Sequence, residues 1–476
     1  MKIKFYGKLE DITANAQDFP LETVELKNRY SFSYNRSAND APLIIDLAED
    51  EVIEVEFADG THWLLPQDEL DSYLRTTVGM RTGDEMVYLP YLIKTNVESN
   101  RGEEEAVATA INILVSTVDE LTTSWLRDKI EHRIMPKEGL FRVNEDFTLQ
   151  PFDQTTADKE NYLLLLHGTA SSTSGSFLEM SNTPEWQKLC QLYPGRIIAL
   201  EHRTLSKSPI ENLADLLSAL PKGANLHLLS YSRGGIIAEL LCRYTKDNIP
   251  FTSAEIAHLP LEQYEADRKL LAEIENLSKA LKLTVEHSVR VACPTQGTKL
   301  LANRLDIFLN VLLNLLTPGA AATFPPLVAI KELLVAVAKQ RSNPAILPGI
   351  EVMKPGSAYQ KLINSSAYPV KSVLSIIAGK GGKGGIKRTL LYLLTRFYFW
   401  EDNDYVVDTD SMFSGQARVD TPQFRLFSGK EVFHFTYFKN QESRKAILEA
   451  LNSTVGQDIT GFTFLPQAIE EDRSWF

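Results

Sequence analysis

The 476-residue sequence has little cysteine: only Cys190, Cys242 and Cys293. Three thiols cannot all pair, and each lies in an apolar run, which excludes a disulfide framework and favours free thiols in a reducing cytoplasm. The first residues, MKIKFYGKLEDITANAQ, lack the apolar core of a secretory signal. We therefore expect a cytoplasmic protein.

Positive charge is also scarce. The sequence has 49 Lys and Arg residues but 62 Asp and Glu residues, which gives a formal net charge of −13. Nucleic acids and anionic membranes are bound through basic surfaces, so the balance argues against both as partners. Histidines and cysteines lack the close spacing of metal ligands. We expect neither a metal nor a cofactor.

Only residues 307–330 are uncharged for long enough to suggest a membrane span. Asn310, Asn314 and two Pro-containing pairs interrupt this stretch. Its helical part, residues 305–316, would be roughly 18 Å long, whereas a bilayer core is roughly 30 Å thick. The stretch predicts two apolar helices joined by a turn.

Residues 1–135 are expected to form a β-rich N-terminal domain with a long helix. In EVIEVEFADGTHWLL, alternating residues flank Asp59–Gly60, which predicts a hairpin. Between about 103 and 134, apolar residues from Val107 to Trp125 recur at steps of three and four. This spacing predicts a helix, whose apolar stripe would pack on its own chain or bind a partner protein.

Residues 136–476 have the pattern of an α/β domain. Helices are expected near 209–219, 233–245, 260–282 and 386–399. They alternate with short apolar runs typical of buried parallel strands: NYLLLLHGT, RIIALEH, NLHLLS, VRVACP and VLSIIAG. The alternation predicts a mostly parallel sheet covered by helices.

The stretch HLLSYSRGGIIAE places Ser232 between a strand and a helix. A nucleophile elbow, G-x-S-x-G, has this context, because its sharp turn raises the serine hydroxyl above the sheet. The turn tolerates only small residues two positions away, here Ser230 and Gly234. Serine in place of the first glycine relaxes the motif, and a simple strand-to-helix turn with a polar cap is the alternative.

A nucleophilic serine needs a base and a carboxylate that orients the base. His434 is the only histidine beyond residue 287 and is expected at the end of a strand; its alternative is a structural role. The acidic loop WEDNDYVVDTDSM offers four candidate acids: Asp402, Asp404, Asp408 and Asp410.

The segment LLLLHGTASS follows the first core strand and predicts part of an oxyanion hole. The amide of Thr169 or Ala170 would supply one donor, with Gly168 allowing a close approach of the backbone. The amide of Arg233, which follows the serine, would supply the other. His167 is expected to be structural.

About residues 155–455 resemble the lipase-like α/β-hydrolases. The segments that carry the resemblance occur in the expected order: HGTASSTSGSF, EHRTLSKSPIENLADLL, SYSRGGIIAELL, ACPTQGTKLL, LPGIEVMKPGSAYQKLIN and NDYVVDTDSM. The chain resembles in particular uncharacterised bacterial hydrolases with a Ser-Arg-Gly-Gly elbow, some of them associated with caspase-like CHAT proteases.

The resemblance implies an α/β-hydrolase fold with a helical lid insertion at about 301–345, and a triad of Ser232, Asp404 and His434. In the related lipases the acid lies in N-D-G-x-V, which matches Asp404 with Tyr405 in place of the glycine. Asp408 is the alternative acid. The insertion would bury an acyl chain as a lid, or would be an ordinary helical addition packed on the sheet.

We therefore expect a serine hydrolase that cleaves a small-molecule or lipid carboxylic ester with an apolar acyl part. A serine peptidase using the same triad is one alternative. Another is a regulated or degenerate hydrolase that serves as an interaction partner or protease target in a bacterial defence system, with a protein bound through the N-terminal domain.

Overall fold

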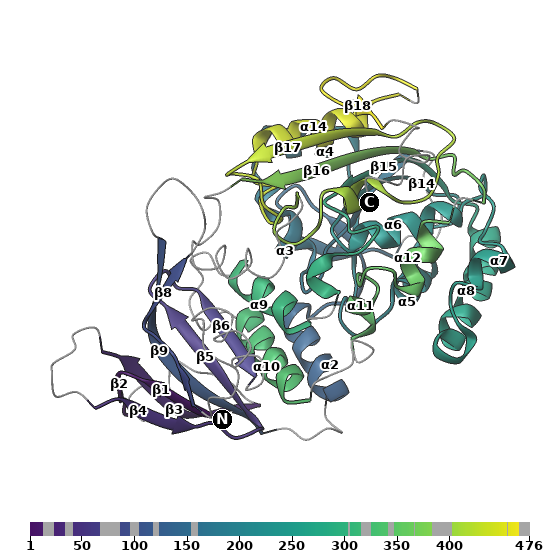
Figure 1. The fold of residues 1–476 in the computed structure, drawn as a ribbon. Coiled ribbons are helices and arrows are strands. Elements are labelled where there is room, and N and C mark those ends of the chain that lie inside the picture. Colours follow the sequence, from purple (N-terminus) through teal and green to yellow (C-terminus); the bar gives the residue numbers. More distant parts are fainter. Residues whose placement is uncertain are drawn as a thin grey trace. The chain divides into compact units, whose positions relative to one another are not determined.

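The computed structural model describes residues 1–12, 23–33, 41–66, 86–95, 104–117, 123–153, 160–302, 305–315, 325–340, 347–365, 367–382, 402–454 and 456–465. The chain divides into two compact units (Figure 1). Unit 1 includes Met1–Arg133 and Arg304–Ile346, and unit 2 includes Ile134–Asn303, Leu347–Gly385 and Trp400–Phe476.

Unit 2 contains a nine-stranded sheet of order β11-β10-β13-β12-β14-β15-β16-β17-β18. The central strands from β13 to β17 are parallel, and the edge pairs β11–β10, β10–β13 and β17–β18 are antiparallel. The bounds are β10 Gly139–Val143, β11 Leu149–Pro151, β12 Asn161–Leu166, β13 Ile197–Glu201, β14 Asn225–Tyr231, β15 Thr284–Val291, β16 Val373–Gly381, β17 Gln423–Gly429 and β18 Thr463–Phe464. The five apolar runs predicted to be buried strands are confirmed.

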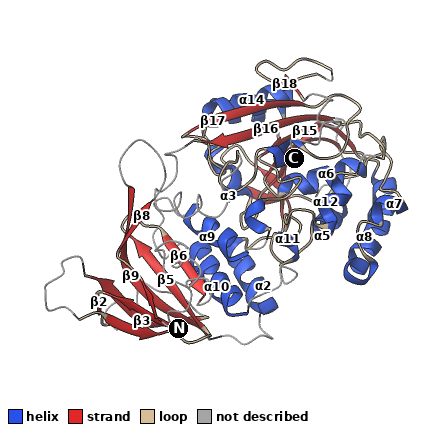
Figure 2. Cartoon of the chain, viewed as in Figure 1, coloured by secondary structure: helices blue, strands red, loops and turns tan. Residues whose placement is uncertain are grey.

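Two groups of helices accompany this sheet (Figures 1 and 2). One contains α4 (Pro184–Leu192) and α14 (Gln441–Asn452), and the other contains α5 (Pro209–Ala219), α6 (Gly234–Arg243) and α8 (Leu261–Leu281). The last three confirm predicted helices, whereas the helix predicted at 386–399 lies outside the described residues. Short helices complete the unit: α3 Thr173–Phe177, η3 Leu178–Met180, α7 Ser253–Ile256, η4 Lys299–Leu301, α11 Pro348–Glu351, α12 Ala358–Ile363 and η6 Asp410–Phe413.

The strand order reverses beside β12. From β12 the chain continues to β13 on one side, and from β14 it continues to β15 on the other. Open α/β sheets bind ligands outside the carboxyl ends of their strands at such a reversal. The loop after β12 and Ser232 after β14 both emerge there. The mostly parallel sheet with its two helix groups has the predicted α/β-hydrolase fold.

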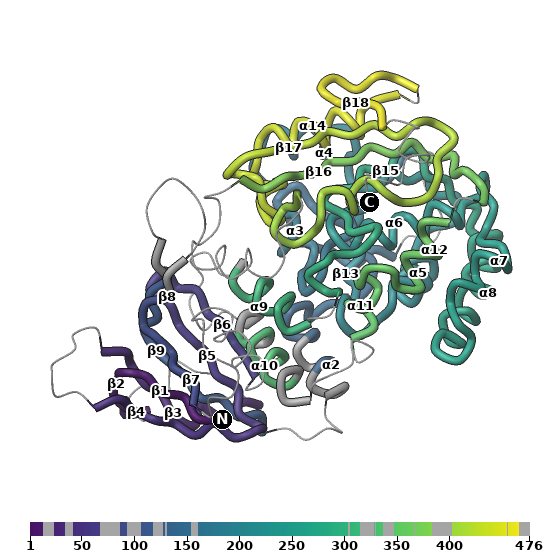
Figure 3. The backbone as a smooth tube through the Cα atoms, in the orientation of Figure 1, coloured from purple at the N-terminus to yellow at the C-terminus, as the bar shows by residue number. Residues whose placement is uncertain are grey.

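Unit 1 is rich in strands, as predicted (Figure 2), and Figure 3 labels them along the backbone trace. Its larger sheet has the order β2-β3-β9-β5-β6 with β8 also on β9, and β4-β1-β7 form a smaller sheet. The bounds are β1 Lys2–Phe5, β2 Gly7–Leu9, β3 Val24–Phe32, β4 Leu43–Asp46, β5 Glu51–Phe57, β6 His62–Pro66, β7 Met86–Tyr88, β8 Leu92–Thr95 and β9 Glu104–Ser116. The predicted hairpin at Asp59–Gly60 joins β5 to β6.

The helix predicted at about 103–134 is wrong over its first half. Residues 104–116 form β9, and among the described residues of this range Thr123–Ile134 are helical, as α2. Strand β9 pairs with both β3 and β5, and Ile111, Ile113 and Leu114 are all buried. A strand buried on both faces is apolar at nearly every position and so also matches helical spacing. The described part of the supposed partner-binding stripe lies largely in the core of unit 1.

The apolar segment near 301–345 contains two helices, α9 (Leu305–Leu315) and α10 (Pro325–Gln340), as predicted. Among the described residues, no helix has both the length and the apolar character needed to cross a bilayer. The helices belong to unit 1, however, and contact β5, β6 and β9. Their assignment to the α/β domain is therefore corrected.

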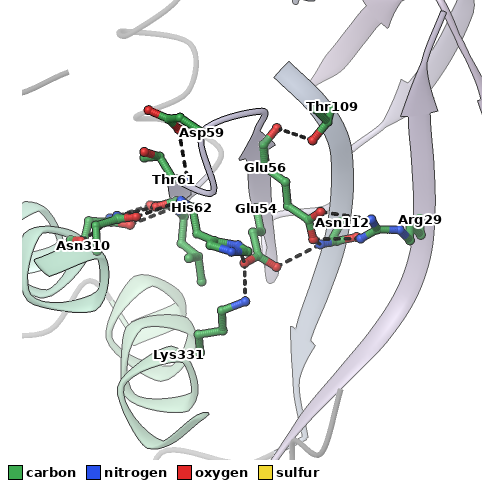
Figure 4. Close-up of polar contacts among 12 residues, drawn as sticks. Arg29, Glu54, Glu56, Asp59, Thr61, His62, Thr109, Asn112, Asn310 and Lys331 are labelled. Atoms are coloured by element: carbon green, nitrogen blue, oxygen red, sulfur yellow. Dashed lines mark hydrogen bonds and ion pairs between the residues drawn. The ribbon is translucent and has the colours of Figure 1, made fainter. Parts of the chain in front are cut away.

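Two asparagines on α9 explain this attachment, and Figure 4 shows one of them, Asn310, beside His62. The Asn310 side chain accepts from the Leu64 amide and donates to the Leu64 carbonyl, both at 2.8 Å. Asn314 makes the same pair of bonds with His62, at 2.8 and 2.6 Å. Four helical residues rise about 6 Å, close to the rise of two strand residues. The helix thus satisfies the outer peptide groups of edge strand β6.

A buried charge cluster also joins α10 to the sheet (Figure 4). Glu54 on β5 is fully buried. Its Oε1 lies 2.6 Å from Lys331 Nζ and 2.8 Å from His62 Nδ1. Burial alone would raise the pKa of Glu54, but the Lys331 ammonium and His62 outweigh burial and lower it well below its ordinary value. The neighbouring Glu56 pairs with Arg29 at 2.8 Å.

Candidate active site

Ser232 lies at the sharp turn between β14 and α6, with a backbone φ of +51°. A positive φ is strained for serine and is the conformation that lifts an elbow nucleophile. A Cβ on Gly234 would lie 2.3 Å from the Leu166 carbonyl oxygen, so only glycine fits there. Ser230 is fully buried, and its hydroxyl donates to the Val289 carbonyl at 3.3 Å. The predicted elbow is present, and serine fits in place of its first glycine.

Three residues from distant segments converge at this turn. The Ser232 Oγ lies 3.0 Å from His434 Nε2, and His434 Nδ1 lies 2.8 Å from Asp404 Oδ2. All three are buried, with Ser232 only 4% exposed. His434 lies in a turn five residues beyond β17, not at the end of a strand as expected. The arrangement can carry a proton from the hydroxyl to the imidazole.

Asp404 is held by donors on both of its oxygens. Oδ1 accepts from the amides of Val406 at 3.2 Å and Val407 at 2.8 Å. Oδ2 accepts from His434 and from the Tyr437 hydroxyl, at 2.8 and 3.0 Å. Burial and the adjacent Asp404 raise the pKa of Tyr437 well above its ordinary value, so this phenol remains a donor.

The departure from the lipase motif at Tyr405 leaves this geometry intact. Tyr405 adopts a φ of +75°, the left-handed conformation that glycine would take. Its amide donates to Asn403 Oδ1 at 2.9 Å, and its hydroxyl donates to the Gly382 carbonyl at 2.8 Å. The alternative acid, Asp408, accepts instead from the Lys299 amide at 2.9 Å.

The remaining candidate acids also lie elsewhere. Asp402 pairs with Lys380 at 2.5 Å, and Asp410 begins a short 3-10 helix. Of the four aspartates in the loop, the structure therefore brings Asp404 to the imidazole of His434.

The loop after β12 lies against Ser232, since a Cβ on Gly168 would be 3.0 Å from the Ser232 Cβ. The Ala170 amide donates to the Thr204 hydroxyl at 2.9 Å. The Thr169 amide has no acceptor within the described part of the chain. Thr169 is therefore the better of the two predicted oxyanion donors. The other predicted donor, the Arg233 amide, directly follows Ser232 in the elbow.

The His167 side chain has a structural position, as expected. Its Nδ1 faces the Gly168 carbonyl at 3.0 Å, and its Nε2 accepts from the His202 amide at 3.2 Å. The two rings stack with their centroids 3.9 Å apart. Burial, with His167 and Arg233 nearby, holds the pKa of His202 well below its ordinary value, so this ring is neutral.

Sequence reasoning missed two tyrosines that position the site. The Tyr231 hydroxyl donates to the His434 carbonyl at 2.7 Å, and Tyr437 contacts Asp404 as described above. Both are aromatic residues in apolar surroundings, a pattern that the sequence shares with ordinary core positions.

Two clusters in the described residues have donors suited to a metal: Glu54, Glu56 and His62 in unit 1, and His227, Glu286 and His287 in unit 2. In the first, Lys331 and Arg29 already neutralise the carboxylates. The second cluster is considered below. Neither cluster includes a residue of the triad.

The sheet and the elbow define the chain as a protein of the α/β-hydrolase fold. The chain belongs to the family described as a domain of unknown function, DUF7379, whose profile matches residues 134–259 and 266–452, well over half of its length. Comparison with curated proteins gave no match.

Similar solved structures include lipases and an esterase. Lipase 1 from Pelosinus fermentans is 15% identical, with a TM-score of 0.41, and covers 62% of this chain and 100% of its own. The mature lipase BlEst2 from Bacillus licheniformis is 16% identical, with a TM-score of 0.31, covering 63% and 96%. Carboxylesterase CesB from Bacillus subtilis is 10% identical, with a TM-score of 0.27, covering 70% and 98%. The fold assignment rests on the strand order and elbow of this chain, not on these similarities.

Proposed function

We propose that the protein is a serine hydrolase that cleaves carboxylic esters with an apolar acyl part. The observation that carries the proposal is the chain of contacts from Ser232 Oγ to His434 Nε2, at 3.0 Å, and from His434 Nδ1 to Asp404, at 2.8 Å. These distances fall within the range at which a base can accept a proton and a carboxylate can orient it.

In the proposed reaction, Ser232 Oγ attacks the ester carbonyl carbon while its proton passes to His434 Nε2. Asp404 stabilises the imidazolium that forms, and the amides of Thr169 and Arg233 stabilise the negative oxygen of the tetrahedral intermediate. The imidazolium then protonates the departing alcohol oxygen, leaving an acyl-serine. His434 next deprotonates a water molecule that attacks this acyl group and releases the acid.

The segment 301–345, which the resemblance implies to be a lid, has its two helices in unit 1. The apolar side chains of α9 and α10 contribute to the packing of unit 1; for example, Ile307, Phe308 and Val311 are buried. Movement of α9 would also carry β6, because Asn310 and Asn314 bond its backbone. The preference for an apolar acyl part has a closer support in Met353, whose sulfur lies 3.5 Å from the Thr169 hydroxyl.

The burial of the triad supports a regulated form of this hydrolase. Ser232 is 4% exposed and His434 2% exposed, so movement of part of the chain would widen the approach of an ester to the hydroxyl. An activator such as a protein partner or a lipid interface would favour the open form.

A fluorophosphonate probe tests the proposal, because it reacts only with an activated serine. We expect the purified protein to be labelled and Ser232→Ala to be unlabelled. Ser218→Ala, which removes an exposed hydroxyl on α5, is the matched control and should be labelled like the wild type. Hydrolysis of p-nitrophenyl esters from acetate to octanoate then measures acyl preference. A wild-type protein that is neither labelled nor active, with or without detergent micelles, overturns the proposal.

A further inference from the structure

A cluster of two histidines and a glutamate lies at the amino-terminal ends of β14 and β15. His227 and His287 pair across these strands at a β-bulge. One ring nitrogen of each histidine and one carboxylate oxygen of Glu286 lie within 4.8 Å of one another. His227 and His287 are 6% and 2% exposed, whereas the Glu286 side chain is 48% exposed. The cluster is therefore built from buried groups with an opening to solvent, and Ser232 lies at the other end of β14.

Two side chains lie against His227 Nε2, and the Asn161 amide nitrogen also donates to Glu286 Oε2 at 3.3 Å. His227 Nε2 lies 3.0 Å from the Asn161 amide nitrogen, a donor, and 3.2 Å from Glu286 Oε2, an acceptor. If Nε2 carries a proton, it opposes the amide of Asn161; if it does not, its lone pair faces the carboxylate. A cation bound by the Nε2 lone pair and by the Glu286 carboxylate would satisfy both groups.

His287 supplies a second, independent observation. Its Nδ1 is buried and has no hydrogen-bond partner in the described part of the chain. A buried polar atom left unpaired costs stability. A neutral imidazole keeps one ring nitrogen without a proton, and the lone pair of that nitrogen can bind a metal.

A metal-bound histidine usually forms a hydrogen bond through the ring nitrogen that does not bind the metal. His227 has such a contact at Nδ1. Its Nδ1 lies 2.6 Å from the Tyr193 hydroxyl, which in turn donates to the Leu451 carbonyl on α14 at 3.4 Å. With Nδ1 protonated toward Tyr193, the lone pair of His227 lies on Nε2 and faces Glu286. The ring is thus already oriented toward the cluster.

We propose that His227, Glu286 and His287 form a zinc site, with the side-chain oxygen of Asn161 as a fourth ligand once its amide rotates. Two imidazoles and a carboxylate are a donor set that Zn²⁺ binds, and tetrahedral ligands at about 2.0 Å from the metal lie roughly 3.3 Å apart. The His227–Glu286 separation of 3.2 Å already matches this spacing. A rotation of His287 brings in the third ligand.

The zinc ion stabilises the beginning of β14 against β15 and, through Tyr193, against α14. This role is separate from the proposed ester hydrolysis. The sequence analysis expected no metal because His227 and Glu286 are 59 positions apart, which no local spacing reveals.

Metal binding to the untagged full-length chain, stripped with EDTA and dialysed, tests the site. We expect Co²⁺ to give the intense visible bands of a tetrahedral complex at one equivalent, and Zn²⁺ to displace it. Glu286→Gln and His287→Gln should each weaken Co²⁺ binding by about tenfold or more. At the same concentration, zinc should raise the melting temperature of the wild type more than those of both variants.

Two control variants separate this site from other effects. Glu275→Gln, which removes a partly exposed carboxylate paired with Lys279 on α8, should bind Co²⁺ like the wild type. Ser232→Ala should also bind normally, so loss of esterase activity and loss of zinc are distinguishable. If His287→Gln fails to fold, Glu286→Gln decides, since Glu286 is partly exposed. Absence of one-equivalent binding, or binding unchanged in Glu286→Gln, overturns the proposal.

Discussion

The hydroxyl of Tyr231 donates a 2.7 Å hydrogen bond to the backbone carbonyl of His434. Tyr231 directly precedes Ser232, so the strand that carries the proposed nucleophile also holds the loop that carries the proposed base. The two rings lie 5.1 Å apart, centroid to centroid. Tyr231 is therefore a positioning residue.

Replacing Tyr231 by phenylalanine removes this bond and keeps the ring. A neutral hydrogen bond contributes about 1 kcal/mol, so we expect kcat on p-nitrophenyl acetate to fall about fivefold with KM unchanged. Tyr264→Phe, which removes the hydroxyl that donates to Glu351, is the control. Equal kinetics in the two variants would show that Tyr231 does not position the base.

The identity of the triad acid can be tested by comparing two aspartates of one loop. Asp404→Asn keeps the shape of the site but favours the wrong tautomer of His434, and we expect kcat to fall by about 10³–10⁴-fold. Asp408→Asn alters the contact with the Lys299 amide, away from His434, and should change kcat by about twofold or less. The reverse order of effects would assign the role to Asp408.

The buried Glu54–Lys331 pair predicts how the stability of unit 1 depends on pH. The pKa of Glu54 is lowered in the folded protein. Its carboxylate therefore stabilises the fold at pH values above 4.5, the ordinary pKa of a glutamate. This contribution is lost as the pH falls below that value toward the lowered pKa. We expect the melting temperature, followed by circular dichroism, to drop in this acidic window.

Removing the partner of Glu54 should change both the stability and its pH dependence. Lys331→Met leaves a buried carboxylate without its ammonium, which costs about 3–5 kcal/mol at neutral pH. Burial then raises the pKa of Glu54, so the variant should recover stability as the pH falls from 7 toward 5. Lys279→Met, on the exposed face of α8, is the control. A pH profile parallel to that of the wild type would mean that Lys331 does not govern Glu54.

The parts of the molecule that sequence analysis predicted are those determined locally. The strand and helix around Ser232 follow from an apolar run, small residues at fixed offsets and a second apolar run. The same reasoning misread 104–116, because a strand buried on both faces matches helical spacing as well. It also missed Asn310 and Asn314, whose side chains bond a strand some 250 positions earlier.

The contacts of Asp404 also depend on long-range structure that local sequence patterns do not predict. The lipase-like motif pointed to Asp404 as the proposed acid, but the donors to Asp404, Val407 and Tyr437, depend on how the loop folds. The His227 cluster has no local pattern at all, since its ligands come together only when β14 and β15 pair. Local patterns thus predict the elbow, and long-range pairing determines the partners of its residues.

The two positions flanking Ser232 in the elbow should respond differently to substitution. Gly234→Ala adds a Cβ that would lie 2.3 Å from the Leu166 carbonyl oxygen, and a backbone atom cannot move aside without shifting β12. We expect a loss of about 3 kcal/mol or more and a large loss of fluorophosphonate labelling. Ser230→Gly restores the common motif and removes only the 3.3 Å bond to Val289, so it should cost about 1 kcal/mol and retain labelling. Unfolding in denaturant and labelling rates measure both effects. Normal labelling of Gly234→Ala would contradict the tight turn on which the proposed nucleophile depends.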